Sequence, residues 1–174
     1  HLVDQLLALA LADEAQHTLE QKAVSLDALV GDAVLRFLPR ADAAGVDLGA
    51  NNAELVCTVL GNGALIAGAL NTLLDNALRY GLASEEAKRI TVALVDNPQS
   101  VVLSVYDNGP GVSKAQLQKL SKRWMQGAAG EALKEGSGLG LAIVKAYVSL
   151  MGAKLQLDSE TPHGLRVSVT FAKP

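Results

Sequence analysis

A stripe of polar side chains runs along residues 71–80, Asn-Thr-Leu-Leu-Asp-Asn-Ala-Leu-Arg-Tyr. At about 100° per residue of a helix, Thr72 and Tyr80 each lie about 40° from Asn76, on opposite sides of it, and Arg79 lies about 60° from Asn76. The amide oxygen of Asn76 is a hard ligand that suits Mg²⁺, which also takes phosphate oxygens. Arg79 could then meet phosphate charge, and Tyr80 could pack against a base or ribose. An ordinary solvated helix face has the same pattern, so the stripe alone identifies no site.

A carboxylate and two glycines follow a predicted strand in the run Asp107-Asn108-Gly109-Pro110-Gly111-Val112. A carboxylate at a strand end can accept a hydrogen bond from the exocyclic amine of a purine, and glycines let the backbone approach the ring. The run is also typical of a plain turn, because Asn-Gly and Pro-Gly are common turn pairs. It therefore indicates a purine site only together with other signals.

Glycines lead directly into a predicted helix in the run Gly136-Ser137-Gly138-Leu139-Gly140-Leu141. The free N–H groups and the positive dipole end of a helix N-terminus can hold phosphate. A dinucleotide-binding fingerprint needs a strand before the glycines, whereas residues 131–135 are polar and loop-like. A P-loop is excluded, because no Gly-x-x-x-x-Gly-Lys-Ser/Thr run occurs.

Apolar periodicity predicts the elements that would position these three segments. The predicted helices are residues 1–20, a helix starting near 25–27, 64–80, 114–122 and 139–151. The predicted strands are one near Val24, a pair within 46–60 bridged by 49–52, a hairpin of 90–94 and 101–105, and a final pair near 155–157 and 165–171. These elements predict an α/β (α+β) two-layer sandwich, in which helices cover one face of a mixed, mostly antiparallel sheet behind a leading helix.

The composition narrows the class of protein. A net charge of −3 with 19% charged residues gives no excess of positive charge of the kind that binds nucleic acid. The one cysteine, Cys57, lies in an apolar run, which predicts a buried core residue in a reducing compartment. No stretch approaches the roughly 18 apolar residues that span a bilayer, and no signal-peptide pattern is present. Because His1 falls within a helical pattern, we expect a piece of a longer protein.

In their order along the chain, the three segments resemble the nucleotide-binding fold of sensor histidine kinases, DNA gyrase, the Hsp90 chaperones and MutL, the Bergerat-type fold. Asp75-Asn76-Ala77-x-Arg79-Tyr80 is similar to the N box of histidine kinases, and the other two segments are similar to their glycine boxes. Arg123-Trp124 stands where these kinases carry an F box. Residues 2–7 resemble the end of the second helix of their dimerisation hairpin. The resemblance covers essentially the whole chain.

The resemblance implies a site for ATP and Mg²⁺ in the catalytic domain of a sensor histidine kinase. It implies that Asn76 coordinates Mg²⁺, that Asp107 binds the adenine amine, and that residues 125–136 form an ATP lid. The other residues that it implies are Gly109, Gly111 and Val112 at the base, Arg79 and Tyr80 at the ribose and phosphates, Arg123 in the F box, and Gly136, Ser137, Gly138, Leu139, Gly140 and Leu141 at the phosphates.

The sequence departs from the family pattern beside Asn76. Most histidine kinases carry a second Asn at the position of Thr72, and the ATP-hydrolysing relatives carry there a Glu that activates water. Thr cannot act as that base, which favours phosphoryl transfer to a protein group. Trp124 also replaces the usual Phe, and Gln126 replaces a basic residue. The alternatives are an ATP-hydrolysing or serine-kinase member of the superfamily, and a non-catalytic dimerisation or sensor module.

A phosphoacceptor histidine is not recognisable in the sequence. The family carries a His followed by Glu or Asp and then Pro, and His1, His17 and His163 lack this context. We therefore expect a protein-histidine kinase fragment that binds ATP but does not phosphorylate itself. Residues 1–20 would be the end of the dimerisation hairpin, and residues 21–174 the catalytic ATP-binding domain.

The resemblance also implies partners and a location. The partners would be ATP or ADP, the dimerisation and phosphoacceptor domain, an Asp of a response regulator, and a second copy in a homodimer. The chain would be a cytoplasmic domain of a protein anchored in the bacterial inner membrane.

Overall fold

A computed structural model describes residues 20–52, 55–80, 87–113, 115, 117, 139–159 and 163–174. The helices in this part of the chain are α2 (Leu26–Ala43), α3 (Gly63–Tyr80) and α6 (Leu139–Leu150). The strands are β1 (Lys22–Ser25), β2 (Asp47–Asn51), β3 (Thr58–Gly61), β4 (Arg89–Asp96), β5 (Ser100–Asp107), β6 (Lys154–Ser159) and β7 (Leu165–Ala172). The predicted leading helix, the predicted lid and most of the predicted helix 114–122 lie outside the described residues.

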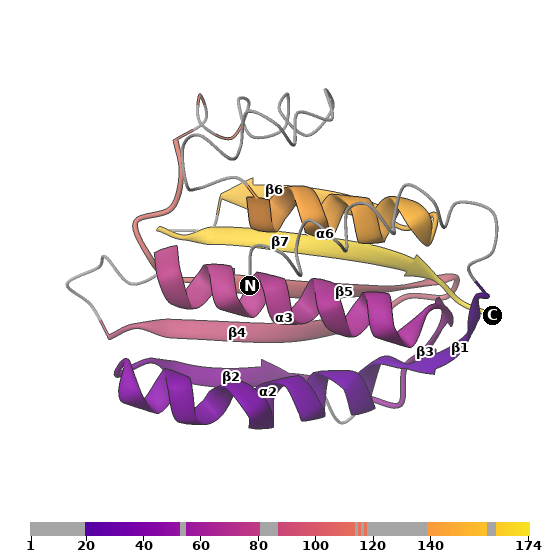
Figure 1. The fold of residues 1–174 in the computed structure, drawn as a ribbon, viewed down its shortest axis with the longest axis horizontal. Coiled ribbons are helices and arrows are strands. Elements are labelled where there is room, and N and C mark those ends of the chain that lie inside the picture. Colours follow the sequence, from indigo (N-terminus) through magenta and orange to yellow (C-terminus); the bar gives the residue numbers. More distant parts are fainter. Residues whose placement is uncertain are drawn as a thin grey trace.

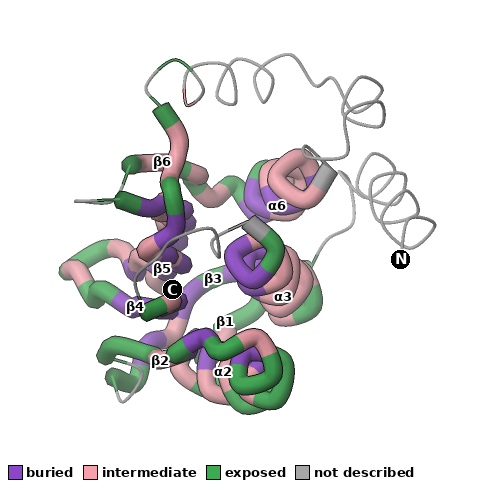
Figure 2. The backbone as a smooth tube through the Cα atoms, turned by 90° about the vertical axis from the view of Figure 1, so that its left-hand side faces the viewer, coloured by how far each residue is buried: buried purple, intermediate pink, exposed green. Residues whose placement is uncertain are grey.

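The main sheet has five strands in the order β2-β4-β5-β7-β6 (Figure 1). Only the β2–β4 pair is parallel, and the other three pairs are antiparallel. Helices α2, α3 and α6 lie side by side on one face of this sheet (Figure 2). The predicted two-layer fold, with a mixed and mostly antiparallel sheet covered on one face, is therefore confirmed.

The predicted strand pair within residues 46–60 is wrong. Residues 49 and 50 lie inside β2, which pairs in parallel with β4. Strand β3 instead pairs with β1 in a separate two-stranded sheet. The Gly-Ala-Asn-Asn run has the composition of a turn, but pairing with strands distant in sequence determines its conformation, and local composition carries no information about that pairing.

The core lies between the sheet and the three helices. Alternation along β5 turns Val101, Leu103 and Val105 towards the helices, and each of them is buried. Cys57 is also buried, as predicted. Helix α3 begins with a capping residue, because the side-chain oxygen of Asn62 accepts hydrogen bonds from the first free N–H groups of the helix. Helix α3 packs against β5, and the candidate site lies beside this contact.

Candidate functional site

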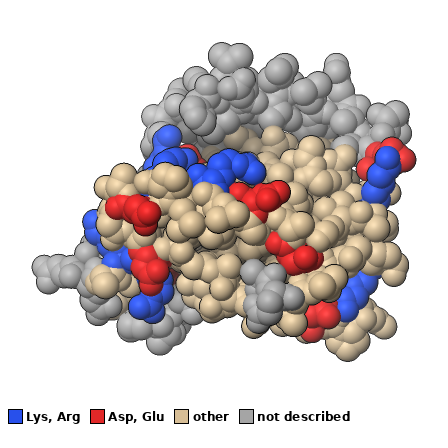
Figure 3. Space-filling view, turned by 90° about the horizontal axis from the view of Figure 1, so that it is seen from below, with Lys and Arg blue, Asp and Glu red and all other residues tan. Residues whose placement is uncertain are grey.

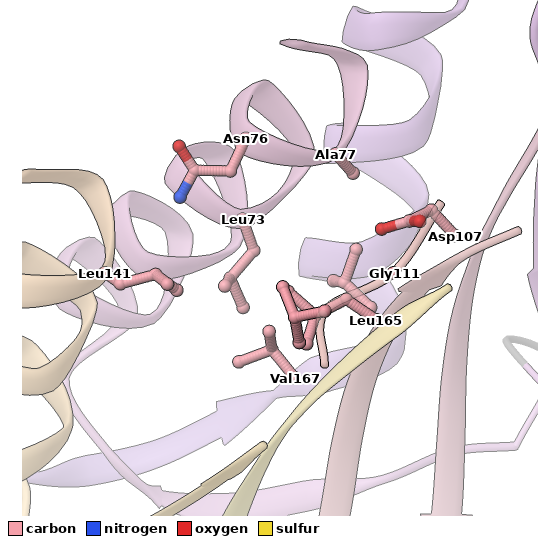
Figure 4. A pocket seen from close by; sticks show the side chains of 10 residues that line it. Leu73, Asn76, Ala77, Asp107, Gly111, Leu141, Leu165 and Val167 are labelled. Atoms are coloured by element: carbon pink, nitrogen blue, oxygen red, sulfur yellow. The ribbon is translucent and has the colours of Figure 1, made fainter. Parts of the chain in front are cut away.

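An open cavity lies between α3, α6 and the sheet, with about 640 Å³ of space that includes part of the open solvent at its mouth. Its lining residues come from α3 (Leu73, Asn76, Ala77), β5 (Val105, Asp107), the loop after β5 (Gly111, Val112), α6 (Leu141) and β7 (Leu165, Val167). Asn76 and Asp107 lie on opposite sides of this cavity, with apolar side chains between them (Figure 4). A largely apolar cavity with a few polar groups is typical of a small-molecule site.

Asp107 lies at the end of β5 and faces the helices, because it continues the alternation that turns Val105 inward. Its residue surface is only 8% exposed. The backbone N–H of Gly109 donates a hydrogen bond of 2.9 Å to its Oδ1 atom. Burial of a carboxylate is costly unless it is hydrogen-bonded, so this contact both stabilises the Asp107 carboxylate and orients it at the cavity wall.

The neighbouring Asn108 fastens the same loop to the start of β4. Its Oδ1 accepts a hydrogen bond of 2.7 Å from the backbone N–H of Arg89, and its Nδ2 donates one of 2.8 Å to the carbonyl of Ala87. Sequence reasoning treated Asn108 as a turn residue within the motif. The structure shows that it fixes the loop that carries Asp107.

Two glycines allow this loop to lie against the turn that precedes β7. Gly111 and Gly164 have positive φ angles of 67° and 121°. A Cβ at Gly111 would lie 2.7 Å from the carbonyl oxygen of Gly164, and a Cβ at Gly164 would overlap the carbonyl oxygen of Asp107. Sequence reasoning missed Gly164, for which the only signal was its place in a Pro-His-Gly turn.

Asn76 extends from α3 towards α6 (Figure 4). A Cβ at Gly140, in the first turn of α6, would lie 2.6 Å from both the Oδ1 and the Nδ2 atoms of Asn76. One turn earlier on α3, the Thr72 hydroxyl donates a hydrogen bond of 2.8 Å to the carbonyl of Gly68. Thr72 therefore bonds to its own helix and is not among the residues that line the cavity.

Arg79 takes part in an ion-pair network between α2 and α3. Its Nε atom lies 3.3 Å from one carboxylate oxygen of Asp75, and the other oxygen lies 2.6 Å from Nη2 of Arg40. Acidic and basic groups adjoin one another on the surface seen from below (Figure 3). In this structure Arg79 thus contacts Asp75 and does not line the cavity.

The structure brings together five of the residues predicted for the site, Asn76, Asp107, Gly111, Val112 and Leu141. Tyr80 ends α3 and Leu139 begins α6. Arg123, Gly136, Ser137 and Gly138 lie outside the described residues. Sequence reasoning missed the apolar lining from Leu73, Ala77, Val105, Leu165 and Val167, because these residues have the pattern of ordinary core positions.

Residues 61–174 match the family described as histidine kinase-, DNA gyrase B- and HSP90-like ATPases. The sensor protein QseC of Salmonella typhimurium is 31% identical over 172 residues, which cover 98% of this chain and 36% of QseC. The histidine-protein kinase/phosphatase MprB of Mycobacterium sp. is 37% identical over 114 residues, or 65% of this chain and 21% of MprB. The chain thus spans only about a third or less of these curated relatives.

A solved structure, full-length ShkA in complex with AMPPNP, is similar to this chain with a TM-score of 0.79. The match covers 99% of this chain and 36% of ShkA at 24% identity. At this identity the likeness establishes the fold. No helix among the described residues is long and apolar enough to cross a membrane.

Proposed function

Because this chain belongs to the family of histidine kinase-, DNA gyrase B- and HSP90-like ATPases, we propose that it is the catalytic domain of a sensor histidine kinase. In this proposal the cavity binds ATP with Mg²⁺ and presents the γ-phosphoryl group to a histidine of the dimerisation hairpin. The buried carboxylate of Asp107 at one end of a largely apolar cavity is the observation that carries the proposal.

The lining of the cavity suits an adenine base in polarity. Its apolar wall from α3, β5 and β7 suits the faces of a purine. Asp107 can accept a hydrogen bond from the exocyclic amine of adenine, whereas guanine has a carbonyl oxygen at the corresponding position. The ShkA structure, which holds the ATP analogue AMPPNP, supports this choice of ligand.

The opposite side of the cavity fits the phosphates and the metal ion. Asn76 supplies an amide oxygen, a hard ligand of the kind that Mg²⁺ takes together with phosphate oxygens and water. Gly140 and Leu141 belong to the first turn of α6, where free backbone N–H groups and the helix dipole favour an anion. Among the described residues there is no cluster of His, Cys, Asp and Glu that could hold a metal ion alone. Phosphate oxygens would therefore complete the coordination.

When bound, Mg²⁺-ATP supplies an electrophilic γ-phosphoryl group whose negative charge the metal partly neutralises. The residues of this chain bind and orient the nucleotide. Asp107 fixes the base, Asn76 and the start of α6 fix the phosphate end, and the apolar wall excludes water from the base. Catalysis of phosphoryl transfer depends mainly on such positioning and electrostatics.

Thr72 supports transfer to a protein group over hydrolysis. Its hydroxyl donates to the carbonyl of Gly68, and a hydroxyl is not basic enough to activate water. The acceptor would be a histidine on the first helix of the dimerisation hairpin. Residues 1–20 would be the end of that hairpin, 21–174 the catalytic domain and 125–136 the lid. An Asp of a response regulator would receive the phosphoryl group next, and the longer protein would be a homodimer anchored in the bacterial inner membrane.

Nucleotide selectivity tests the adenine assignment. Non-hydrolysable analogues of ATP and GTP are titrated with Mg²⁺ into wild type, Asp107→Ala and the control Asp96→Ala. Asp96 lies at the other end of the β4–β5 hairpin, where it pairs with Lys173. We expect Asp107→Ala to weaken ATP binding about 10- to 100-fold, because a hydrogen bond to a charged group is lost, and to abolish the preference for ATP. Asp96→Ala should bind as wild type does. An unchanged preference in Asp107→Ala would show that the adenine assignment is wrong.

A further inference from the structure

Helices α3 and α6 approach each other closely at two glycines. On α3, a Cβ at Gly68 would lie 2.9 Å from Cε2 of Tyr147 on α6. On α6, a Cβ at Gly140 would lie 2.6 Å from the amide of Asn76 on α3. Real Cβ atoms essentially never lie within 3.0 Å of another heavy atom. At both positions, therefore, the absence of a side chain allows the observed contact.

The two contacts differ in what the glycine faces. At Gly140 the added Cβ would be equally close, at 2.6 Å, to Oδ1 and to Nδ2 of Asn76, and 3.0 Å from Cγ. Such a Cβ would therefore lie directly in front of the amide end, midway between its two polar atoms. The amide of Asn76 thus takes up the space beside Gly140 that a side chain at position 140 would need.

We infer that Gly140 is a positioning residue, which holds the Asn76 amide in place by lacking a side chain. This inference rests on the proposed function, because it concerns how Asn76 would meet Mg²⁺ and phosphate. Asn76 is half-buried on its helix, and both polar atoms of its amide lie within 3.0 Å of where a Cβ at position 140 would stand. A Cβ at position 140 would push both amide atoms away from the observed position.

Substitution of Gly140 by alanine distinguishes the positioning of the Asn76 amide from phosphate binding by the backbone at the start of α6. Alanine keeps the backbone N–H, so any N–H contact to phosphate remains available. The clash falls on the far end of a flexible side chain, which can rotate away without moving either helix. The fold should therefore survive, since alanine is also a better helix former than glycine. Only the placement of the amide should change.

The test compares Gly140→Ala with the matched control Gly68→Ala. Both variants add one methyl group to the α3–α6 contact, but neither Gly68 nor Tyr147 lines the cavity.

The dissociation constant of an ATP analogue is measured with Mg²⁺ and with EDTA. We expect Gly140→Ala to weaken binding about 10- to 100-fold in Mg²⁺, the range found when the partners that orient metal ligands are changed, and to change it little in EDTA. Its unfolding midpoint should stay at or above that of wild type. Gly68→Ala should keep the wild-type response to Mg²⁺.

A double mutant measures whether the effect acts through Asn76. In an Asn76→Ala background the amide is absent, so Gly140→Ala should cause no further loss of affinity. An equal loss in Gly140→Ala with and without Mg²⁺, or the same loss in Gly68→Ala, would show that the methyl group acts by separating the helices, and would overturn the inference. So would Mg²⁺-dependent affinity in Gly140→Ala equal to that of wild type.

A measurement without nucleotide separates this inference from the proposed function. The side-chain NH₂ signals of Asn76 are compared by NMR in wild type, Gly140→Ala and Gly68→Ala. We expect them to shift in Gly140→Ala and to keep their positions in Gly68→Ala, and unchanged signals in Gly140→Ala would overturn the inference. If wild type bound no nucleotide while these signals shifted as expected, the proposed function would fail and the positioning of Asn76 would stand.

Discussion

Gly164 lies against the backbone carbonyl of Asp107, so closely that any side chain at position 164 would overlap it. Asp107 ends β5, and Gly164 directly precedes β7, the neighbouring strand in the sheet. The turn before β7 therefore supports the loop after β5 from one side, while Asn108 fastens that loop to β4 on the other. The position of the Asp107 carboxylate depends on both contacts.

We expect Gly164→Ala to destabilise the protein and to weaken nucleotide binding. The φ angle of 121° is strained for any residue with a side chain, and the clash falls on backbone that cannot rotate away. The free energy of unfolding should fall by about 2 kcal/mol or more, and affinity for an ATP analogue should fall at a temperature where the variant is folded. Urea unfolding and calorimetric titration measure these changes.

Gly45→Ala is the matched control for this substitution. Gly45 also has a positive φ, of 66°, but a Cβ there would have no neighbour within 4 Å. This control should lose only about 1 kcal/mol from backbone strain, with nucleotide affinity unchanged. Equal losses of stability and of affinity in the two variants would contradict the supporting role of Gly164.

Asp27 should make stability depend on pH in the acid range. Its pKa is held below the usual value, first by the hydrogen bond from the Ser25 hydroxyl and then by the one from the backbone N–H of Cys57. A carboxyl whose pKa is lower in the folded state stabilises the fold above its unfolded pKa, about 3.9, and this stabilisation is lost as pH falls through the folded pKa. Asp27→Asn should therefore cost a few tenths of a kcal/mol near pH 7, because solvent screens this carboxylate, and progressively less below pH 4.

Unfolding by urea at a series of pH values measures this difference. Ser25→Ala, which removes the first donor but keeps the carboxylate, should give a smaller change with the same sign. Parallel profiles of stability against pH for wild type and Asp27→Asn would show that the interactions of Asp27 do not depend on its charge.

The network around Asp75 should contribute measurably to stability. The Asp75 carboxylate joins Arg40 of α2 to Arg79 of α3, and its side chain is 24% exposed. Asp75→Asn removes the charge at constant size and should cost about 0.5–1 kcal/mol, less at high salt because of screening. Asp47→Asn is the control, since the Asp47–Arg89 pair is more than 60% exposed on both sides. It should change the free energy of unfolding by a few tenths of a kcal/mol at most. Equal effects in the two variants would contradict a special role for Asp75.

Elements whose pairing or packing is local in sequence could be predicted from sequence. The β4–β5 hairpin follows from two alternating segments and the turn between them, where Asn97 N–H donates to the carbonyl of Ser100. Helix α3 follows from its apolar period. Strands β2 and β3 could not be paired correctly, because β2 joins β4 in parallel and β3 joins β1, across long segments of chain.

The residues of the site also divide into those that could be predicted from the sequence and those that could not. Polar residues and glycines in motifs, such as Asn76, Asp107 and Gly111, could be predicted because their types are unusual for a core. The apolar wall could not, because Val105 and Val167 have the pattern of ordinary buried strand residues. The contact of Gly164 with Asp107 depends on how two distant turns pack, which no local pattern encodes. The predicted place of Arg79 beside the phosphates stays a prediction, and in the structure its partner is Asp75.

The most direct test of the proposed function is a calorimetric titration of the protein with a non-hydrolysable ATP analogue, with and without Mg²⁺, and with the matching GTP analogue. The proposal predicts saturable binding of one ATP analogue per chain, strengthened by Mg²⁺, and clearly weaker binding of the GTP analogue. The absence of both binding heat and a thermal shift with the ATP analogue and Mg²⁺ would contradict it.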